Sequence, residues 1–346
     1  MKAAGLMKPW VTGLDEYVPG QMRDGFVKLA SNENNYGPST KVIAEIKKWA
    51  RRAYIYPYRD DEVVEGAAKY AGVGTENIVP GNGSDEIIEL ILKTFKGPVG
   101  SISPTYSEYR LFSEAVGEEY VSSRLGGGFC FDAGRFIRET QRANILFLCS
   151  PNNPTGGVIP REDVAKVAET GKIVVVDEAY WEFSGEKSAA CLVSEYENLI
   201  VMRTLSKAFG LAGGRFGYAI ANPEIAKVML KIKAPFSVSL ITQAAAIAAF
   251  KDTTHMRKCA RSIREDTKLV YKELSRRFKA CPTRSNFVFF DTSPKYTSKE
   301  FFDRMLEKMI IVRSFGRIEG FAGEYSRVSA GTREETKKFV KALKEL

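Results

Sequence analysis

The middle of the chain alternates short apolar segments with amphipathic ones, and this order constrains the fold more than any other feature of the sequence. Strands are expected at residues 77–80, 99–101, 144–149, 172–176, 199–202 and 215–221. Helices are expected between them, at residues 84–95, 106–115 and 161–170. Strands that alternate with helices predict an α/β fold with a mostly parallel sheet and helices on both faces.

The two ends of the chain follow a different pattern. Residues 1–30 have no clear periodicity and are expected to form an arm, so the large domain is expected to span residues 31–237. Beyond it, helical segments at 239–251, 256–278 and 298–309 and apolar segments at 286–291, 310–312 and 325–330 predict a smaller α+β domain, residues 238–346.

Composition excludes several classes of protein. No apolar run among the 346 residues is long enough to span a bilayer, and the first residues do not resemble a signal peptide, so we expect a cytoplasmic protein without a membrane partner. The net charge of +9 raises the possibility of nucleic-acid binding, but the charges are dispersed among helices that also carry acids, so none is expected. The single histidine, His255, excludes a multi-histidine zinc site; it lies in a basic helical stretch and is expected at the surface.

A single lysine, Lys207, follows the strand expected at 199–202 and lies among hydroxyl residues and glycines. Thr204, Ser206 and Arg215 can converge on an anion beside it. This arrangement suits a lysine that forms a Schiff base next to a bound phosphate. An ordinary surface lysine in a loop is the alternative, and this stretch alone does not decide between the two.

Three further polar loops follow expected strands. Residues 81–86 lead into a helix whose free N–H groups can bind a phosphate, although many such turns are only helix caps. Residues 150–156 hold Asn153 between two prolines, and a rigid turn is the alternative interpretation. Asp177 ends a buried strand and needs a partner there; a pyridinium nitrogen is one candidate, and a metal ion is the other, although no cluster of ligands accompanies it.

These four loops are expected to lie close together. The carboxyl ends of parallel strands share one edge of a sheet, where ligands bind. Phosphate-binding N–H groups, an amide, a carboxylate and a lysine would then meet in one cleft.

Motifs along nearly the whole chain resemble the fold-type I, class II pyridoxal-phosphate aminotransferases, and are most similar to the histidinol-phosphate aminotransferases. The core motifs are Pro-Asn-Asn-Pro-Thr-Gly (151–156), Val-Asp-Glu-Ala-Tyr (176–180), Thr-Leu-Ser-Lys-Ala-Phe-Gly-Leu-Ala-Gly (204–213) and Arg-Val-Ser-Ala-Gly-Thr-Arg-Glu-Glu (327–335). Near the start, Tyr-Val-Pro-Gly (17–20) and Leu-Ala-Ser-Asn-Glu-Asn (29–34) match as well.

The resemblance implies pyridoxal 5′-phosphate as cofactor, no metal, and a homodimer in which the arm packs on the small domain and the partner subunit. Lys207 would form the Schiff base and transfer protons, Asp177 would pair with the ring nitrogen, and Asn153 and Tyr180 would contact the ring oxygen. Tyr106 would stack on the ring. The remaining implied contacts are to the cofactor phosphate (Gly83, Ser84, Thr204 or Ser206, Arg215, and Tyr56 from the other subunit) and to the substrate (Tyr17, Asn153, Arg313 and Arg327).

The reaction implied is transfer of the amino group of L-histidinol phosphate to 2-oxoglutarate, giving imidazole acetol phosphate and glutamate in histidine biosynthesis. Aromatic amino-acid aminotransferases and threonine-phosphate decarboxylases share these loops and stay open as alternatives. So does, from another class, a non-catalytic ligand- or nucleic-acid-binding protein on the same scaffold. Asn35 stands where the family usually has proline, so a stiffened substrate loop is expected to be lost. Arg333 is either a second anion-binding residue or a paired surface arginine.

Overall fold

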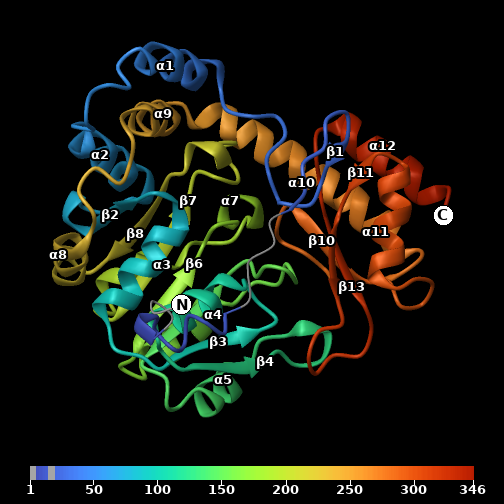
Figure 1. Ribbon diagram of the computed structural model, residues 1–346, viewed down its shortest axis with the longest axis horizontal. Coiled ribbons are helices and arrows are strands. Elements are labelled where there is room, and N and C mark those ends of the chain that lie inside the picture. The colour runs from blue at the N-terminus through green and yellow to red at the C-terminus, as the bar shows by residue number, and fades with distance from the viewer. Residues whose placement is uncertain (1–4, 15–19) are drawn as a thin grey trace.

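A central sheet organises the computed structural model, which describes residues 5–14 and 20–346 (Figure 1). Within these residues the sheet has seven strands in the order β2-β8-β7-β6-β5-β3-β4. Strand β8 runs antiparallel to both its neighbours, and the remaining pairs are parallel, so the predicted mostly parallel α/β fold is confirmed. The strands are β2 (Ile78–Gly81), β3 (Val99–Ser103), β4 (Tyr120–Arg124), β5 (Ile145–Cys149), β6 (Ile173–Asp177), β7 (Leu199–Thr204) and β8 (Gly217–Ala221).

Two hydrophobic cores, one on each face, hold this sheet between helices. Successive side chains of a strand point to opposite faces. In β5, Leu146 and Leu148 therefore join one core, while Ile145 and Phe147 join the other. The helices of this part are α1 (Thr40–Ala50), α2 (Asp60–Ala71), α3 (Gly83–Thr94), α4 (Glu108–Val116), α5 (Ala133–Glu139), α6 (Arg161–Ala168), α7 (Trp181–Ser184), α8 (Pro223–Ile232) and α9 (Leu240–Lys251).

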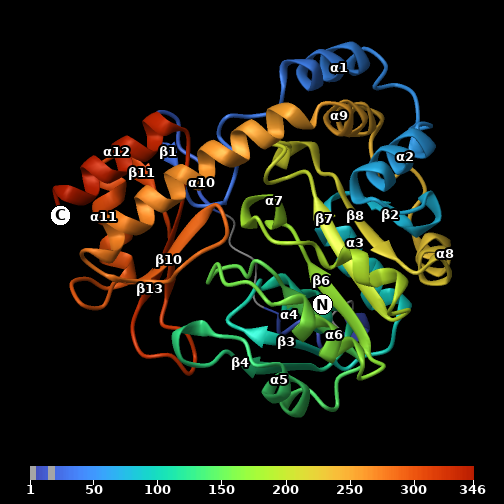
Figure 2. The same ribbon diagram turned by 180° about the vertical axis from the view of Figure 1, so that it is seen from behind.

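A second, antiparallel sheet lies beside the first, and the long helix α10 (Thr253–Ser275) runs between the two parts (Figures 1 and 2). Its strand order within the described residues is β12-β13-β10-β9. Near it, β1 (Val27–Lys28) pairs in parallel with β11 (Ile310–Ile311), so an N-terminal segment joins the C-terminal part. The remaining elements are β9 (Lys279–Ala280), β10 (Phe287–Asp291), β12 (Arg313–Gly316), β13 (Tyr325–Ser329), α11 (Ser298–Glu307) and α12 (Arg333–Lys344).

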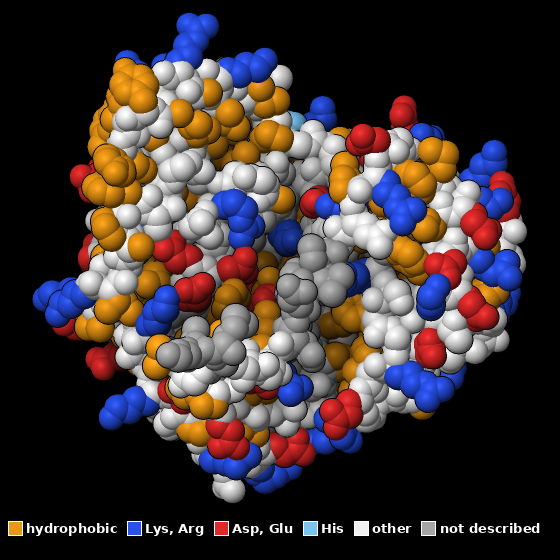
Figure 3. All heavy atoms as spheres, in the orientation of Figure 1, with side chains coloured by type: hydrophobic (Ala, Val, Ile, Leu, Met, Phe, Trp, Pro, Cys, Tyr) orange, Lys and Arg blue, Asp and Glu red, His pale blue; other side chains and the backbone are white. Residues whose placement is uncertain are grey.

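The surface carries mixed charge. On the face shown in Figure 3, Lys and Arg side chains are interspersed with Asp and Glu, and apolar side chains gather over the region of α1 and α2. None of the described helices is long and apolar enough to cross a bilayer. The prediction for His255 was wrong: its ring is half-buried, with Nε2 3.1 Å from the carbonyl oxygen of Gly37, because α10 packs against the loop that precedes α1.

Candidate active site

The four polar loops meet around one cavity. Strands β2, β5, β6 and β7 run in the same direction, so the loops that follow them share one edge of the central sheet. The cavity has a volume of about 270 Å³ and is also bordered by residues of β12 and β13. Of the residues that the sequence indicated, it brings together Ser84, Tyr106, Asn153, Asp177, Tyr180, Thr204, Ser206, Lys207, Arg215, Arg313 and Arg327.

Lys207 lies half-buried in this cavity. Its Nζ donates a hydrogen bond to the carbonyl oxygen of Ser31 at 3.1 Å and lies 5.7 Å from the centre of the Tyr180 ring. Burial, and then the positive charge of Arg327, lower the pKa of Lys207 to about 8. A lysine with this pKa is partly neutral near physiological pH, and the neutral amine is the form that attacks a carbonyl carbon.

Asp177 is only 3% exposed at the end of β6. Its Oδ2 accepts a hydrogen bond from the Tyr109 hydroxyl at 2.6 Å, and its Oδ1 accepts one from the backbone N–H of Ala179 at 2.9 Å. Burial raises the pKa of this carboxyl group. Within the described residues Asp177 makes no ion pair, so it is a buried acid suited to a cation from outside the chain.

An anion-binding corner is formed where α3 begins. Gly83 has φ +81°, a backbone conformation that favours glycine, and a Cβ atom there would lie 2.5 Å from Nη2 of Arg215 and would force that side chain to move. The first N–H groups of α3 are available for hydrogen bonding and carry the positive end of the helix dipole. Arg215 borders the same corner, and its Nη2 donates to Oδ2 of Asp85 at 2.8 Å.

The two hydroxyl residues before Lys207 differ in their contacts. The Thr204 hydroxyl donates to the carbonyl oxygen of Phe216 at 3.1 Å and accepts from the backbone N–H of Ser206 at 3.1 Å. These bonds hold the loop in shape. The Ser206 hydroxyl is 3.0 Å from that of Thr204 and also borders the cavity, so it is the better placed of the two to donate to a phosphate.

The two asparagines of the 150–156 loop also have different functions. Asn152 is buried and holds the loop, since its amide nitrogen donates to the carbonyl oxygen of Pro104 and to the Thr155 hydroxyl, both at 2.9 Å. Asn153 faces the cavity, and its Oδ1 accepts a hydrogen bond from Nη1 of Arg327. Its amide nitrogen is the group left to meet a ring oxygen.

The antiparallel sheet contributes a wall of the cavity. Arg327 of β13 is 6% exposed and donates from Nη2 to the carbonyl oxygen of Ala30 at 2.6 Å. Arg313 and Phe315 of β12 border the cavity beside it. A guanidinium held by its neighbours in this way is suited to carboxylate or phosphate.

Some residues indicated by the sequence lie elsewhere. Tyr56 is 74% exposed, and its ring centre lies 4.8 Å from that of Phe236, away from the cavity of the same chain. Arg333 forms ion pairs with Glu265 at 3.3 Å and Asp266 at 2.9 Å, so the alternative of a paired arginine applies. Tyr17 lies outside the described residues.

Asn35 anchors the loop in which it replaces the expected proline. Its amide nitrogen donates to the carbonyl oxygen of Lys28 at 3.3 Å and to Oε2 of Glu335 at 3.0 Å. Hydrogen bonds to β1 and to the distant helix α12 therefore restrain this loop. The expectation that its stiffness is lost took only the backbone of residue 35 into account.

Two residues of the site were missed in the sequence. Tyr109 is fully buried in α4 and supports Asp177. Asn32, with φ 57°, donates from its amide nitrogen to the Tyr180 hydroxyl at 3.0 Å. A second tyrosine three residues after Tyr106 was the available signal for the first, and the Asn-Glu-Asn motif was the signal for the second.

These residues fit pyridoxal 5′-phosphate. Asp177 matches a protonated ring nitrogen, Lys207 matches the aldehyde carbon, and the corner at Gly83, Ser84 and Arg215 matches the phosphate. A metal ion is a poorer match, because no group of three His, Cys, Asp or Glu side chains in the described chain is arranged to bind one.

Comparison with known proteins agrees with this chemistry. Residues 24–343 match the family described as aminotransferase class I and II. The chain is 37% identical to the histidinol-phosphate aminotransferase of Methanosarcina mazei, over 98% of this chain and 96% of the relative. The histidinol-phosphate aminotransferase structure from Clostridium acetobutylicum superposes with a TM-score of 0.86 at 27% identity, over 92% of this chain and 98% of that one. That from Sinorhizobium meliloti, in complex with pyridoxal-5′-phosphate, has a TM-score of 0.88 at 25% identity, over 98% and 96%.

Proposed function

The chain belongs to the class I and II aminotransferases, and we propose that it transfers the amino group of L-histidinol phosphate to 2-oxoglutarate with pyridoxal 5′-phosphate as cofactor. The observation that carries the proposal is the meeting of Lys207, with its lowered pKa, and the unpaired buried Asp177 in one cavity. The names of the relatives favour this substrate over phenylalanine or threonine phosphate.

Each residue of the cavity has a proposed task. The bound cofactor supplies an aldehyde and an electron-withdrawing ring that stabilises negative charge beside the amino group. Asp177 keeps the ring nitrogen protonated, and Tyr109 keeps Asp177 in position. Lys207 would hold the cofactor covalently, and its amine would move a proton at the substrate carbon next to nitrogen. Asn153 and Tyr180 orient the ring oxygen, and Arg327 or Arg313 binds the acidic groups of the substrate.

The covalent role of Lys207 is tested on the purified protein. We expect a yellow protein whose visible absorbance band disappears on borohydride reduction, with the added mass found on the peptide that contains Lys207. Lys207→Ala should lose at least about 10⁴-fold in turnover while keeping its circular dichroism. A colourless protein that takes up no cofactor would reject the proposal.

The substrate is tested with a panel of histidinol phosphate, phenylalanine and threonine phosphate. Arg313→Ala is expected to raise the KM for histidinol phosphate at least about tenfold, because a charged hydrogen bond to the phosphate is lost. The KM for phenylalanine, which has no phosphate, should stay the same. Faster turnover of phenylalanine, or release of carbon dioxide from threonine phosphate, would assign the enzyme to one of the alternatives.

A second copy of the chain is the proposed partner. Exposed apolar side chains between α1 and α2 support this, since such a patch on a protein surface indicates an interface. Tyr54 is 85% exposed and Tyr56 is 74% exposed, and Tyr58, Ile43 and Phe236 are exposed as well, with the Phe236 ring 4.8 Å from that of Tyr56. Figure 3 shows apolar side chains gathered over the region of α1 and α2.

Subunit mixing tests whether Tyr56 completes the site of the partner. Lys207→Ala and Tyr56→Ala variants, each of low activity alone, are unfolded together and refolded. Random pairing gives heterodimers with one intact site each, so about one quarter of the sites should recover. No recovery in dimers that do form would place Tyr56 outside the partner's site.

A further inference from the structure

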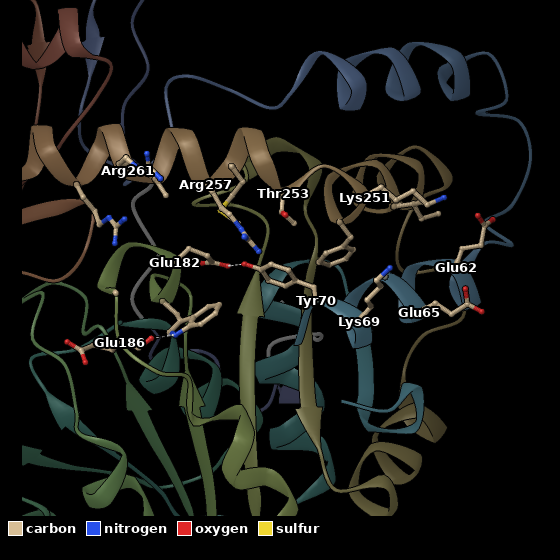
Figure 4. Close-up of a pocket in the computed structure, with 18 residues that line it drawn as sticks. Glu62, Glu65, Lys69, Tyr70, Glu182, Glu186, Lys251, Thr253, Arg257 and Arg261 are labelled. Carbon is tan, nitrogen blue, oxygen red and sulfur yellow. Dashed lines mark hydrogen bonds between the residues drawn. The ribbon is translucent and has the colours of Figure 1, made fainter. Parts of the chain in front are cut away.

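A second and larger cavity lies outside the candidate active site, between α2, α7, the end of α9 and the start of α10 (Figure 4). Its volume is about 980 Å³, which is within the range of small-molecule sites in proteins. It shares none of its lining residues with the active-site cavity. The chemistry described so far leaves this cavity without a function.

Three arginines of α10 form one wall of the second cavity: Arg257, Arg261 and Arg264. Their spacing of four and three residues places them on one face of the helix. Within the described residues none of the three forms an ion pair, whereas Arg276, near the end of α10, pairs with Glu273 at 2.6 Å. Figure 4 shows Arg257 pointing from α10 toward Tyr70 and Glu182.

The opposite wall closes the cavity and leads back to the active site. The guanidinium of Arg264 lies beside Gly185, the residue that follows α7, since a Cβ atom on Gly185 would be 3.5 Å from its Nη1. Glu182 accepts a hydrogen bond from the Tyr70 hydroxyl at 3.3 Å. Trp181 and Glu182 follow directly after Tyr180, so this wall and the active site are built on one continuous segment.

We propose that this cavity is a binding site for a small organic polyanion, a molecule with two or more phosphate or carboxylate groups. Guanidinium groups bind both kinds of group through paired charged hydrogen bonds. Residues 257 and 264 are seven positions apart, which is about 10 Å along a helix, so the row of arginines suits several linked anionic groups better than one. Lys69 and Lys251, on α2 and α9, also line the cavity, as do four carboxylates, those of Glu62, Glu65, Glu182 and Glu186. The excess of positive charge in the cavity is therefore small and is concentrated on the arginines of α10.

Titration calorimetry on the cofactor-loaded enzyme tests the proposal, with tripolyphosphate and citrate as the phosphate and carboxylate probes. Tripolyphosphate is expected to bind at least about tenfold more tightly than inorganic phosphate at equal ionic strength, because it reaches more than one arginine. The better of the two probes identifies the kind of anionic group that the site prefers. Affinity for tripolyphosphate no greater than for inorganic phosphate would overturn the polyanion assignment.

Matched variants locate the binding. Arg257→Ala/Arg261→Ala should lose at least about tenfold in affinity for tripolyphosphate. Lys258→Ala/Lys268→Ala removes the same charge from exposed positions of α10 outside the cavity and should change affinity less than about threefold. Equal losses in the two variants would show general attraction to a basic helix and overturn the site.

Two further measurements separate this cavity from the active site. Burial raises the pKa of Glu182 to about 7, so at pH 8 Glu182→Gln removes a negative charge from the opposite wall of the second cavity and should strengthen tripolyphosphate binding a few fold. Saturating histidinol phosphate should leave the affinity for tripolyphosphate unchanged. Displacement of tripolyphosphate by histidinol phosphate would place the probe in the active site and reject the proposal, and neither measurement depends on turnover.

Discussion

Asp177 and Glu178 are adjacent buried carboxylates with opposite surroundings. Glu178 accepts hydrogen bonds from Nε of Arg203 at 3.0 Å, from the Ser188 hydroxyl at 2.7 Å and from the backbone N–H of Ala189 at 2.6 Å. Asp177 accepts two hydrogen bonds and has no basic partner among the described residues. Since neighbouring side chains of a strand point to opposite faces, one sheet edge supports two different polar clusters.

The difference indicates where a ligand belongs. Around Glu178 the chain supplies both charges of the pair, and the Arg203 guanidinium also stacks on Trp181, 4.2 Å from its ring centre. The charges of this pair balance each other within the chain, and the pair links β7 to the end of β6. Around Asp177 the chain supplies the acid and leaves the cation to another molecule, which matches a cofactor with a protonated ring nitrogen.

Replacing the carboxylate on the ligand side should have the largest effect on catalysis. Asp177→Asn removes the charge that keeps the ring nitrogen protonated, so kcat/KM is expected to fall about 10²–10³-fold. The free energy of unfolding of the cofactor-free protein should change by less than about 1 kcal/mol, because a desolvated charge is removed and hydrogen bonding is kept. Steady-state kinetics measure kcat/KM, and denaturant unfolding measures the free energy of unfolding. A large loss of stability would show that Asp177 is as structural as Glu178.

Replacing Glu178, the other carboxylate, should reverse this pattern and affect stability more than catalysis. Glu178→Gln leaves the Arg203 charge buried without its counter-ion, so the free energy of unfolding is expected to fall by about 3 kcal/mol. A double variant, Glu178→Leu/Arg203→Met, removes both charges and should recover much of this loss. Denaturant unfolding compares the variants. Recovery no better than the single substitution would mean that the pair is not the source of the stability.

The hydroxyl of Tyr109 sharpens the comparison, since it gives Asp177 one of its two hydrogen bonds. Tyr109→Phe is expected to lower kcat about tenfold with little change in the KM for substrate. The lost bond also favours the protonated form of Asp177, so activity should begin to fall at a higher pH on the acid side of the pH profile. Tyr106→Phe, which loses a hydrogen bond to Asp85 instead, should not shift the acid side of the pH profile.

The smallest effect concerns the pH at which Lys207 reacts. Because the pKa of Lys207 is lowered to about 8, the rate of cofactor uptake by cofactor-free protein should rise with pH with a midpoint near 8 and level off about one pH unit higher. Arg327→Ala removes the second cause of this lowering after burial, so the midpoint should move to higher pH. Stopped-flow absorbance measures the uptake. An unchanged midpoint would show that burial alone sets the pKa.

Much of the active-site cavity at this edge of the central sheet was predictable from the sequence. Each of its loops is local: an apolar strand ends and a polar motif begins, as at Asp177 and around Lys207. The antiparallel direction of β8 was not predicted, although the short connection from β7 at residues 205–216 leaves little room for the crossover that a parallel neighbour needs. The edge strand β4 was missed, because its Tyr-Val-Ser-Ser-Arg sequence is half-exposed and lacks an apolar run.

The contacts between distant segments could not be read from local patterns. Tyr109 is 68 residues from Asp177, and Asn32 is 148 residues from Tyr180. The pairing of Glu178 with Arg203 likewise depends on the register between β6 and β7. Such partners follow from the packing of the whole chain, so the sequence indicated the groups that face a ligand but not the groups that hold them.

The pairing of an N-terminal segment with the C-terminal part has a consequence for synthesis of the protein. Arg327 binds the carbonyl oxygen of Ala30 across 297 positions, and Asn32 and Ser329 are joined across the same separation. Because a ribosome releases the chain from its N-terminus, these contacts form only after β13 has been translated. A nascent chain can fold its central sheet early and still lack the guanidinium and hydroxyl that complete the cavity. Activity therefore depends on residues that are made long after Lys207, and a product that ends before β13 keeps Lys207 without a finished site around it.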